Sequence, residues 1–281
     1  MLFHHHGYVS TNPRVQVAAG IGLDRPAELP DEMDVLIVGS GPAGMIAAAQ
    51  LAMFPDVHTR IIERRPHRLE IGQADGIQAR SVETFQAFGF ASEIIDEAFD
   101  LTSMAFWNPA EDDADTIVRT SLAEDDPEGV SEFPHLIVNQ ARILDWFAEY
   151  MKNSPTRARP DYGWAFETLE DTNDGEHPVL VTLRRTVDAQ GNALEDPASG
   201  PTRQVRAKYV VGADGAGSRV RKAIGHTLTG DAANHAWGVM DALADTDFPD
   251  IRTKCAIHSS SGSILLIPRE GGHLFRMYVD L

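Results

Sequence analysis

Cysteine is almost absent from this sequence, and acidic residues far outnumber basic ones. The single cysteine, Cys255, excludes an intrachain disulfide framework and favours a reducing, cytoplasmic compartment. With 24 Lys and Arg against 42 Asp and Glu, the chain lacks the cationic surplus that contacts to nucleic-acid phosphates require, so we expect no nucleic-acid partner. No apolar run approaches the ~18 residues of a membrane helix, so we expect no membrane partner either.

The N-terminus lacks the basic start and long apolar centre of a secretory signal. Its three adjacent histidines, His4-His5-His6, favour a flexible arm over a metal site, and we expect no bound metal. What the chain does contain is a hydrophobic fraction of 43%, which is ample for the core of one large domain or two moderate ones.

The segment 33–44 carries the most informative pattern, because it predicts a buried strand, a glycine turn and the start of a helix. Gly39 permits the tight turn, Gly41 lets the backbone approach a pyrophosphate, and Gly44 lets the helix pack close to the strand. Glu63 ends the next predicted strand, near the spacing expected for a carboxylate on the adenosine ribose. Such a carboxylate disfavours a 2′-phosphate, so the motif predicts FAD or NAD; the alternative is an ordinary turn.

A second glycine turn follows a predicted strand at 208–212 and precedes another helix start. Asp214 and Gly215 form its centre. A carboxylate there can accept hydrogen bonds from a hydroxyl-rich ligand chain, or it can simply cap the helix that follows. Both interpretations stay open.

The remaining periodicity predicts helices and short strands. Two helices are expected, one that starts near Ser81 and has its first section ended by Gly89, and one over 139–151. A strand over 179–183 should form a hairpin through a polar loop at 188–201. Further strands are expected at 104–107, 116–118, 236–244, 255–258, 263–267 and 274–279, and the last four should build a second, mainly antiparallel sheet.

Four segments together carry a family resemblance: GSGPAG at 39–44, GQADGIQARS at 72–81, SEFPHLIVNQAR at 131–142 and VVGADGAGSRVR at 210–221. In this order they resemble the FAD-dependent aromatic hydroxylases, specifically the phenol 2-monooxygenase branch and its hydroxybenzoate-hydroxylating members. The resemblance implies an α/β fold. It places an N-terminal lead-in at 1–32, a Rossmann-like FAD-binding domain with strand insertions at 33–230, and the start of an antiparallel substrate-binding sheet at 231–281.

The resemblance also implies which residues form the sites. Gly39, Gly41, Gly44 and Glu63 match its ADP-binding motif, Asp214 and Gly215 match its Asp-Gly motif, and Arg80 and Gln140 match polar positions beside the cofactor. The substrate residues that it implies are Asp75 beside the substrate hydroxyl, Tyr278 on the same oxygen, and Lys254 and His135 near a ring carboxylate. Each of the last four has a structural alternative: Asp75 as a turn former, Tyr278 as core, Lys254 as an exposed strand lysine and His135 as a packed histidine.

The implied activity is hydroxylation of a phenol or hydroxybenzoate ortho to its hydroxyl, with FAD bound and NAD(P)H and oxygen consumed. Asp75 would act as general base and Tyr278 would hold the developing phenolate oxygen. Lys254 would pair with a substrate carboxylate and so orient the ring. A reductase or halogenase on the same scaffold is one alternative, although the lysine-centred motif expected of a halogenase is not found.

The family's third motif, a Gly-Asp segment, is not found in its expected place. The letters at 230–235 imitate it, but they follow the Asp-Gly helix too soon. We therefore expect the chain to be the N-terminal portion of a longer enzyme. An inactive or partial FAD- or nucleotide-binding fragment is the alternative function, and a homodimer stays open.

Overall fold

The computed structural model describes residues 2–4, 7–9, 26, 28–72, 74–231 and 236–281. The chain forms two compact units, and each is built from two separate segments. The first unit comprises residues 1–70 and 143–229, and the second comprises residues 71–142 and 230–281. Most of the lead-in predicted over 1–32 lies outside the described residues; within the described part, β1 (Leu2–His4) and β2 (Gly7–Val9) pair antiparallel.

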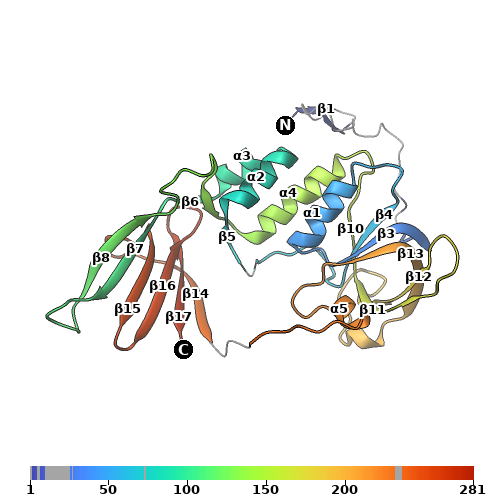
Figure 1. The fold of residues 1–281 in the computed structure, drawn as a ribbon. Coiled ribbons are helices and arrows are strands. Elements are labelled where there is room, and N and C mark those ends of the chain that lie inside the picture. Colours follow the sequence, from blue (N-terminus) through green and yellow to red (C-terminus); the bar gives the residue numbers. More distant parts are fainter. Residues whose placement is uncertain (1, 5–6, 10–25, 27, 73, 232–235) are drawn as a thin grey trace. The chain divides into compact units, whose positions relative to one another are not determined.

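The first unit is built on a six-stranded sheet with the order β10-β4-β3-β13-β12-β11 (Figure 1). Its strands are β3 (Glu32–Val38), β4 (Thr59–Glu63), β10 (Pro160–Tyr162), β11 (Trp164–Asp171), β12 (Val179–Arg185) and β13 (Thr202–Gly212). The strands from β10 to β13 pair in parallel, whereas β13, β12 and β11 pair antiparallel. The predicted strand–helix–strand unit and the predicted hairpin are both confirmed.

Helices follow from the local sequence. α1 (Pro42–Leu51) begins with proline at its first position, where the missing N–H costs nothing, and packs against β3 and β4. α4 (Gln140–Lys152) has the predicted apolar side, since Ile143, Phe147 and Met151 are all buried. Two short elements complete the unit, α5 (Arg219–Ala223) and the 3₁₀ turn η1 (Pro197–Ser199).

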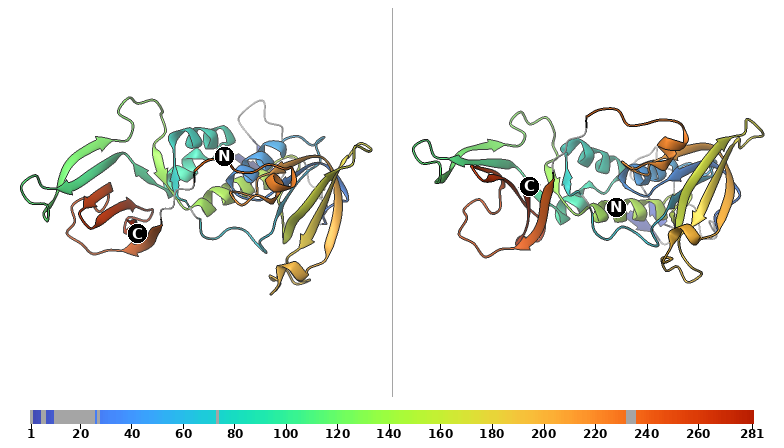
Figure 2. Two further views of the ribbon diagram at one scale, coloured as in Figure 1. Left: turned by 60° about the horizontal axis from the view of Figure 1, so that its bottom comes forward. Right: turned by 90° about the horizontal axis from the view of Figure 1, so that it is seen from below.

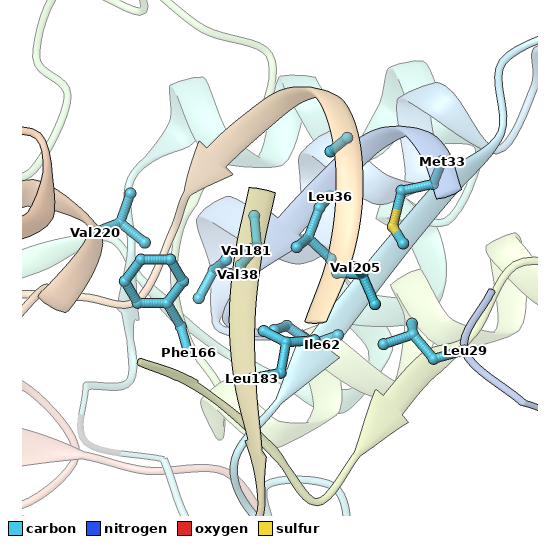
Figure 3. Close-up of a cluster of buried hydrophobic side chains, with 11 residues drawn as sticks. Leu29, Met33, Leu36, Val38, Ile62, Phe166, Val181, Leu183, Val205 and Val220 are labelled. Carbon is cyan, nitrogen blue, oxygen red and sulfur yellow. The ribbon is translucent and has the colours of Figure 1, made fainter. Parts of the chain in front are cut away.

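A buried apolar cluster of the first unit lies on its sheet. It joins residues from strands that are far apart in the sequence, and Figure 3 shows Leu36, Ile62, Phe166, Val181 and Leu183 converging. This burial fixes the parallel strands side by side, so the turns that follow them come to one edge of the sheet.

The second unit holds another six-stranded sheet, with the order β14-β17-β16-β15-β7-β8 (labelled in Figure 1). Figure 2 shows its strands, in green and red, from two further sides. Its strands are β7 (Ser103–Pro109), β8 (Ile117–Glu124), β14 (Trp237–Leu243), β15 (Lys254–Ser259), β16 (Gly262–Pro268) and β17 (Leu274–Asp280). Among the pairings of these described strands, only β15 with β7 is parallel. The predicted α/β fold with a mostly antiparallel second sheet is confirmed.

A small three-stranded sheet, β5-β9-β6, also belongs to the second unit. Its strands and the two neighbouring helices are β5 (Gly76–Ile77), β6 (Phe99–Leu101), β9 (His135–Ile137), α2 (Ala79–Phe88) and α3 (Ala91–Glu97). Gly89 ends α2 in the left-handed conformation, with φ of 82°, as its glycine predicts. The predicted FAD-binding domain at 33–230 includes residues 71–142, and its bounds remain a prediction; by compactness, the structure groups residues 71–142 with residues 230–281.

The helices in the described part of the chain are all too short or too polar to cross a bilayer.

Leu183 tests the core of the first unit. Its side chain is fully buried in the apolar cluster, so Leu183→Ala should lower the free energy of unfolding by about 2–5 kcal/mol through lost burial and a residual cavity. Denaturant unfolding monitored by circular dichroism gives the value. Leu228→Ala is the matched control, because Leu228 is 73% exposed and its truncation should cost less than about 0.5 kcal/mol. Equal losses in the two variants would contradict the assignment of this core.

Candidate functional site

The two glycine turns of the first unit lie next to each other. Because β3 and β13 pair in parallel, their carboxyl ends meet, and the amide of Ala213 donates to the carbonyl of Val38 over 2.8 Å. Gly39 has φ of +104°, and a Cβ built on it would lie only 2.5 Å from the carbonyl oxygen of Ala213. Glycine is therefore required at Gly39 both for the backbone conformation and for the approach of the second turn.

Gly41 and Gly44 have opposite surroundings. A Cβ on Gly44 would lie 1.9 Å from the carbonyl oxygen of Gly39, so the helix can approach the turn only because Gly44 has no side chain. A Cβ on Gly41 would meet no described atom within 4 Å. Gly41 is also the N-cap of α1 and contributes no side-chain cap, so the start of the helix faces open space with amide donors.

Glu63 lies beside the first turn and is buried. Its Oε2 accepts from the amide of Ser40 over 3.0 Å and from the hydroxyl of Ser40 over 2.9 Å. Its Oε1 accepts from the amide of Arg65, and the guanidinium of Arg65 reaches Oε2 over 3.0 Å. Burial raises the pKa of Glu63, but the amide of Arg65, the amide of Ser40 and the charge of Arg65 outweigh it, so the pKa lies below its ordinary value.

Asp214 caps the helix that follows it. Its Oδ1 accepts from the hydroxyl of Ser218, and its Oδ2 accepts from the amides of Arg219 and Val220 over 2.6 and 3.2 Å. Burial opposes ionisation, but these donors outweigh it and hold the pKa of Asp214 below its usual value. Of the two interpretations left open, the structure supports helix capping. Contact with a ligand chain remains a prediction, as it does for Gly215, which adopts φ of +84° next to it.

Arg80 and Gln140 lie in the second unit. Arg80 is highly exposed in the first turn of α2 and pairs with Glu83. Gln140 starts α4, and its backbone N–H donates to the carboxylate of Asp75. Their predicted position beside a cofactor therefore stays a prediction.

Asp75 is a buried charge at the centre of the second unit, with 5% of its surface exposed. It directly precedes β5, and its carbonyl accepts from the amide of Val138 over 2.9 Å, which fixes the backbone. Two buried guanidinium groups contact its Oδ2: Arg269 through Nη1 at 2.8 Å, and Arg276 through Nη1. Neither contact has hydrogen-bond geometry, so Oδ2 has no hydrogen-bond partner among the described residues.

The pKa of Asp75 lies above its ordinary value. Burial is the largest cause, and the positive charges of Arg269 and then Arg276 only partly offset it. A buried carboxylate with a raised pKa is a chemically competent proton acceptor.

Tyr278 and Lys254 lie on the same face of the second sheet. Tyr278 is in register with Val239 on β14 and Leu265 on β16, and Leu265 is in register with Ala256. Side chains alternate along a strand, so Lys254, two residues before Ala256, shares this face. Arg276, two residues before Tyr278, shares it for the same reason.

The opposite face of this sheet is apolar. It carries the cluster of Ala105, Cys255, Leu266 and Phe275. The sheet therefore buries one face as core and presents Tyr278, Arg276 and Lys254 on the other. Asp75 reaches this second face through Arg276.

His135 is buried on β9, and its Nδ1 lies 3.3 Å from Oδ1 of Asp125. Its Nε2 lies 3.6 Å from the position of a Cβ built on Gly76, the residue after Asp75. The pairing with Asp125 supports a packed histidine, and contact with a substrate carboxylate remains a prediction. No group of three or more His, Cys, Asp and Glu side chains is placed to hold a metal ion in the described part of the chain.

Sequence reasoning missed several residues that organise these sites. Ser40 and Arg65 hold Glu63, and their positions inside the turn and directly after the strand were available signals. Arg269 and Arg276 hold Asp75, and Arg276 stands opposite Asp241 across the strand pair β14–β17. The sequence signal for Arg276 was a charged residue in a predicted strand, two positions before Tyr278. Its contact with Asp75 could not be predicted, because Asp75 lies some 200 residues away in sequence.

Comparison with known proteins supports the family resemblance. A family model described as FAD binding domain matches residues 32–281. A 3-hydroxybenzoate 4-monooxygenase of Comamonas testosteroni is 47% identical over 282 residues, covering 100% of this chain and 43% of its own length. A phenol 2-monooxygenase of Aspergillus fumigatus is 30% identical over 251 residues, covering 89% of this chain and 39% of its own length. The chain thus spans less than half the length of these curated relatives.

Solved structures share the fold. The p-nitrophenol 4-monooxygenase PnpA of Pseudomonas putida superposes with a TM-score of 0.71 at 17% identity, covering 90% of this chain and 58% of that protein. The flavin-dependent monooxygenase PieE, solved with FAD and substrate, gives a TM-score of 0.70 at 20% identity, covering 90% of this chain and 44% of its own. The family model matches nearly the whole chain, and this match confirms the resemblance. The chain belongs to the family of FAD-binding monooxygenases.

Proposed function

We propose that this protein is a FAD-dependent monooxygenase that hydroxylates a phenol or hydroxybenzoate ortho to its hydroxyl group. Support comes from the family match and from two sites in the structure, a glycine turn with Glu63 in the first unit and a buried carboxylate with Tyr278 in the second. When bound, FAD would supply the activation of molecular oxygen, with NAD(P)H as the source of electrons.

The residues present fit the ADP half of FAD. The first turn leaves open space at Gly41, and the uncapped start of α1 offers amide donors to phosphate oxygens. Glu63 lies within 3.0 Å of the turn and is ionised at neutral pH, so it can accept hydrogen bonds from the ribose hydroxyls. Asp214 and Gly215 lie on the adjoining turn, where further hydroxyl groups of the same ligand would pass.

The observation that carries the proposed chemistry is the burial of the Asp75 carboxylate in the unit that also holds Tyr278. A phenol hydroxyl could donate to this carboxylate, whose contacts with Arg269 and Arg276 lack hydrogen-bond geometry. The proton would pass to Oδ2, which makes the ring carbons more nucleophilic, and the hydroxyl of Tyr278 would donate to the phenolate oxygen that forms. Burial favours this step, because it raises the proton affinity of the Asp75 carboxylate.

The surroundings of Tyr278 suit an aromatic ring. Its neighbours across the strands, Leu265 and Val239, are apolar, and Lys254 is the cationic group on the same sheet face. An aromatic ring could pack on the apolar side chains while a carboxylate pairs with Lys254, which would select the carbon to be hydroxylated. A hydroxybenzoate would pair its carboxylate with Lys254, whereas an unsubstituted phenol has no group to do so. His135 would be a second contact for the same carboxylate.

The alternative is a partial FAD-binding module without turnover, favoured by the short span of the chain relative to its relatives. One experiment separates the two. The purified chain is incubated with FAD, freed of excess flavin and assayed with 3-hydroxybenzoate, NADH or NADPH, and air. Retained flavin absorbance with an ortho-dihydroxy product supports the monooxygenase. Retained flavin without product supports the module, and a colourless protein overturns both.

Gly41 and Gly44 provide a matched pair for the cofactor site. Gly41→Val should leave the thermal midpoint unchanged but reduce FAD retention at least about tenfold, because its side chain enters the space proposed for the pyrophosphate. Gly44→Val should lower the thermal midpoint as well, because its Cβ collides with the carbonyl of Gly39. Thermal unfolding and flavin absorbance measure the two effects. Full flavin retention by Gly41→Val would contradict the proposed cofactor position.

Asp75 provides the test of the proposed base. Asp75→Ala should slow hydroxylation about 10²-fold or more while FAD stays bound, because the phenol proton then has no acceptor. Product formation by chromatography and flavin absorbance are read on the same samples. Glu97→Ala, which removes a carboxylate of the same unit that pairs with Arg142, is the control and should retain most of the rate. Unchanged turnover in Asp75→Ala would sink this assignment.

A further inference from the structure

A cavity of about 500 Å³ lies in the first unit, apart from the candidate cofactor site. Small-molecule sites in proteins typically enclose roughly 300–1,000 Å³. Its walls come from β10, the start of β11, the end of β12 and the start of β13, together with Glu28 and Leu29 before β3. Among the described residues, those that line the cavity do not include Glu63, Asp214 or the glycines of the two turns.

The cavity gathers positive charge in an acidic chain. Its charged lining residues are Arg159, Arg185, Arg203, Glu28 and Asp161. The charge of Asp161 is already neutralised, because its two oxygens accept from Nε and Nη2 of Arg60 over 2.8 and 2.7 Å, and both side chains are buried. The lining therefore has a positive surplus, although the whole chain carries a net charge of −18.

Arg185 is a half-buried cation of this lining and forms no ion pair with a described carboxylate. Its Nη1 donates to the carbonyl oxygen of Tyr162 over 3.0 Å, and its guanidinium lies 5.0 Å from the ring centre of Trp164. These contacts hold the guanidinium in place, while its Nε and Nη2 donate to no described residue. Burial lowers the pKa of Arg185, and the charge of Asp161 only partly offsets this effect. A partly desolvated cation without a counter-charge favours an anion beside it.

The other two arginines have no buried partner. The Nη2 of Arg203 lies 2.8 Å from Oδ1 of Asp31, but 84% of the Asp31 side chain is exposed, so water screens this pair. Arg159 is exposed and forms no ion pair within the described part of the chain. Both guanidinium groups therefore remain available to a ligand in the cavity.

We propose that this cavity binds a small oxyanion, a carboxylate or a phosphate, with Arg185 as the principal contact and Arg203 and Arg159 as supporting contacts. The planar fork of a guanidinium group matches two oxygens of either anion. Trp164 adds an aromatic wall, so the cavity also suits an anion that carries an aromatic ring.

Trp164 is a probe inside the cavity. The chain has four tryptophans, so nitrogen-labelled protein should give one indole N–H signal for each in NMR spectra, and Trp164→Phe assigns the signal of interest. At constant ionic strength, benzoate or inorganic phosphate should shift the Trp164 signal saturably, with half-saturation at about 1 mM or below. Benzamide, the neutral analogue of benzoate, should not. Saturation by only one of the two anions assigns the oxyanion to that class.

Substitutions at neighbouring arginines separate this site from general electrostatic attraction. Arg185→Met should weaken binding at least about tenfold, because its free N–H groups are lost, and Arg185→Lys should restore only part of it. Arg184→Met is the matched control. It removes the same charge from the adjacent residue of β12, whose side chain points to the opposite face and pairs with Glu167, so binding should not change.

Arg159→Met keeps the test valid should Arg185→Met fail to fold, because Arg159 has no partner to lose within the described part of the chain. It should weaken binding about threefold or more and leave the thermal midpoint unchanged. A wild-type Trp164 signal that does not saturate with either anion would overturn the inference. So would full binding in folded Arg185→Met, or equal losses in Arg184→Met and Arg185→Met.

The titration needs neither FAD nor turnover. Benzoate at the candidate substrate site would act on the second unit, which contains Trp107 and Trp237, and a response of those signals alone would count against this inference. Gly41→Val, which fills the proposed pyrophosphate position, should leave the response of Trp164 to phosphate in place. A Trp164 response without hydroxylation counts against the proposed function alone.

Discussion

The parallel pairing of β3 with β13 is the constraint on which the cofactor site depends. The two strands are separated by more than 160 residues, yet their carboxyl ends meet, so Gly39 packs directly against Ala213. The pairing is held by apolar side chains such as Leu36 and Val205 in one buried cluster. Because the core fixes the strands, the two turns stay together, and the start of α1 keeps open space and no side-chain cap.

The second unit uses charge where the first uses apolar contact. Its sheet buries one face around Cys255 and Leu266 and presents polar side chains on the other. Burying Asp75 and two arginines there costs desolvation free energy, and the pairing of opposite charges offsets that cost. The pairing does not give Oδ2 of Asp75 a hydrogen bond of good geometry. An incompletely satisfied buried carboxylate is a poor stabilising element, and for that reason it points to chemistry.

The local pattern predicted most of the elements. Glycine spacing and the apolar run at Val35 fixed the first turn, and the apolar stripe ending at Met151 fixed α4. The division of the chain into two compact units could not be predicted from local patterns in the same way. Residues 103–124 lie inside the domain predicted at 33–230, and their β7 pairs with β15, which follows 145 residues later. Nothing local in a strand indicates which distant strand will satisfy its backbone donors and acceptors.

The sequence by itself determined the strand–turn–helix junction of the first unit and the strand that ends at Glu63, because those features depend on residues close together in the chain. Only the tertiary structure decided that Asp214 caps α5, that the guanidinium groups of Arg269 and Arg276 contact Asp75, and that Lys254 shares a sheet face with Tyr278. These relations arise from strand register and from the burial of charge, and both are properties of segments brought together by the core.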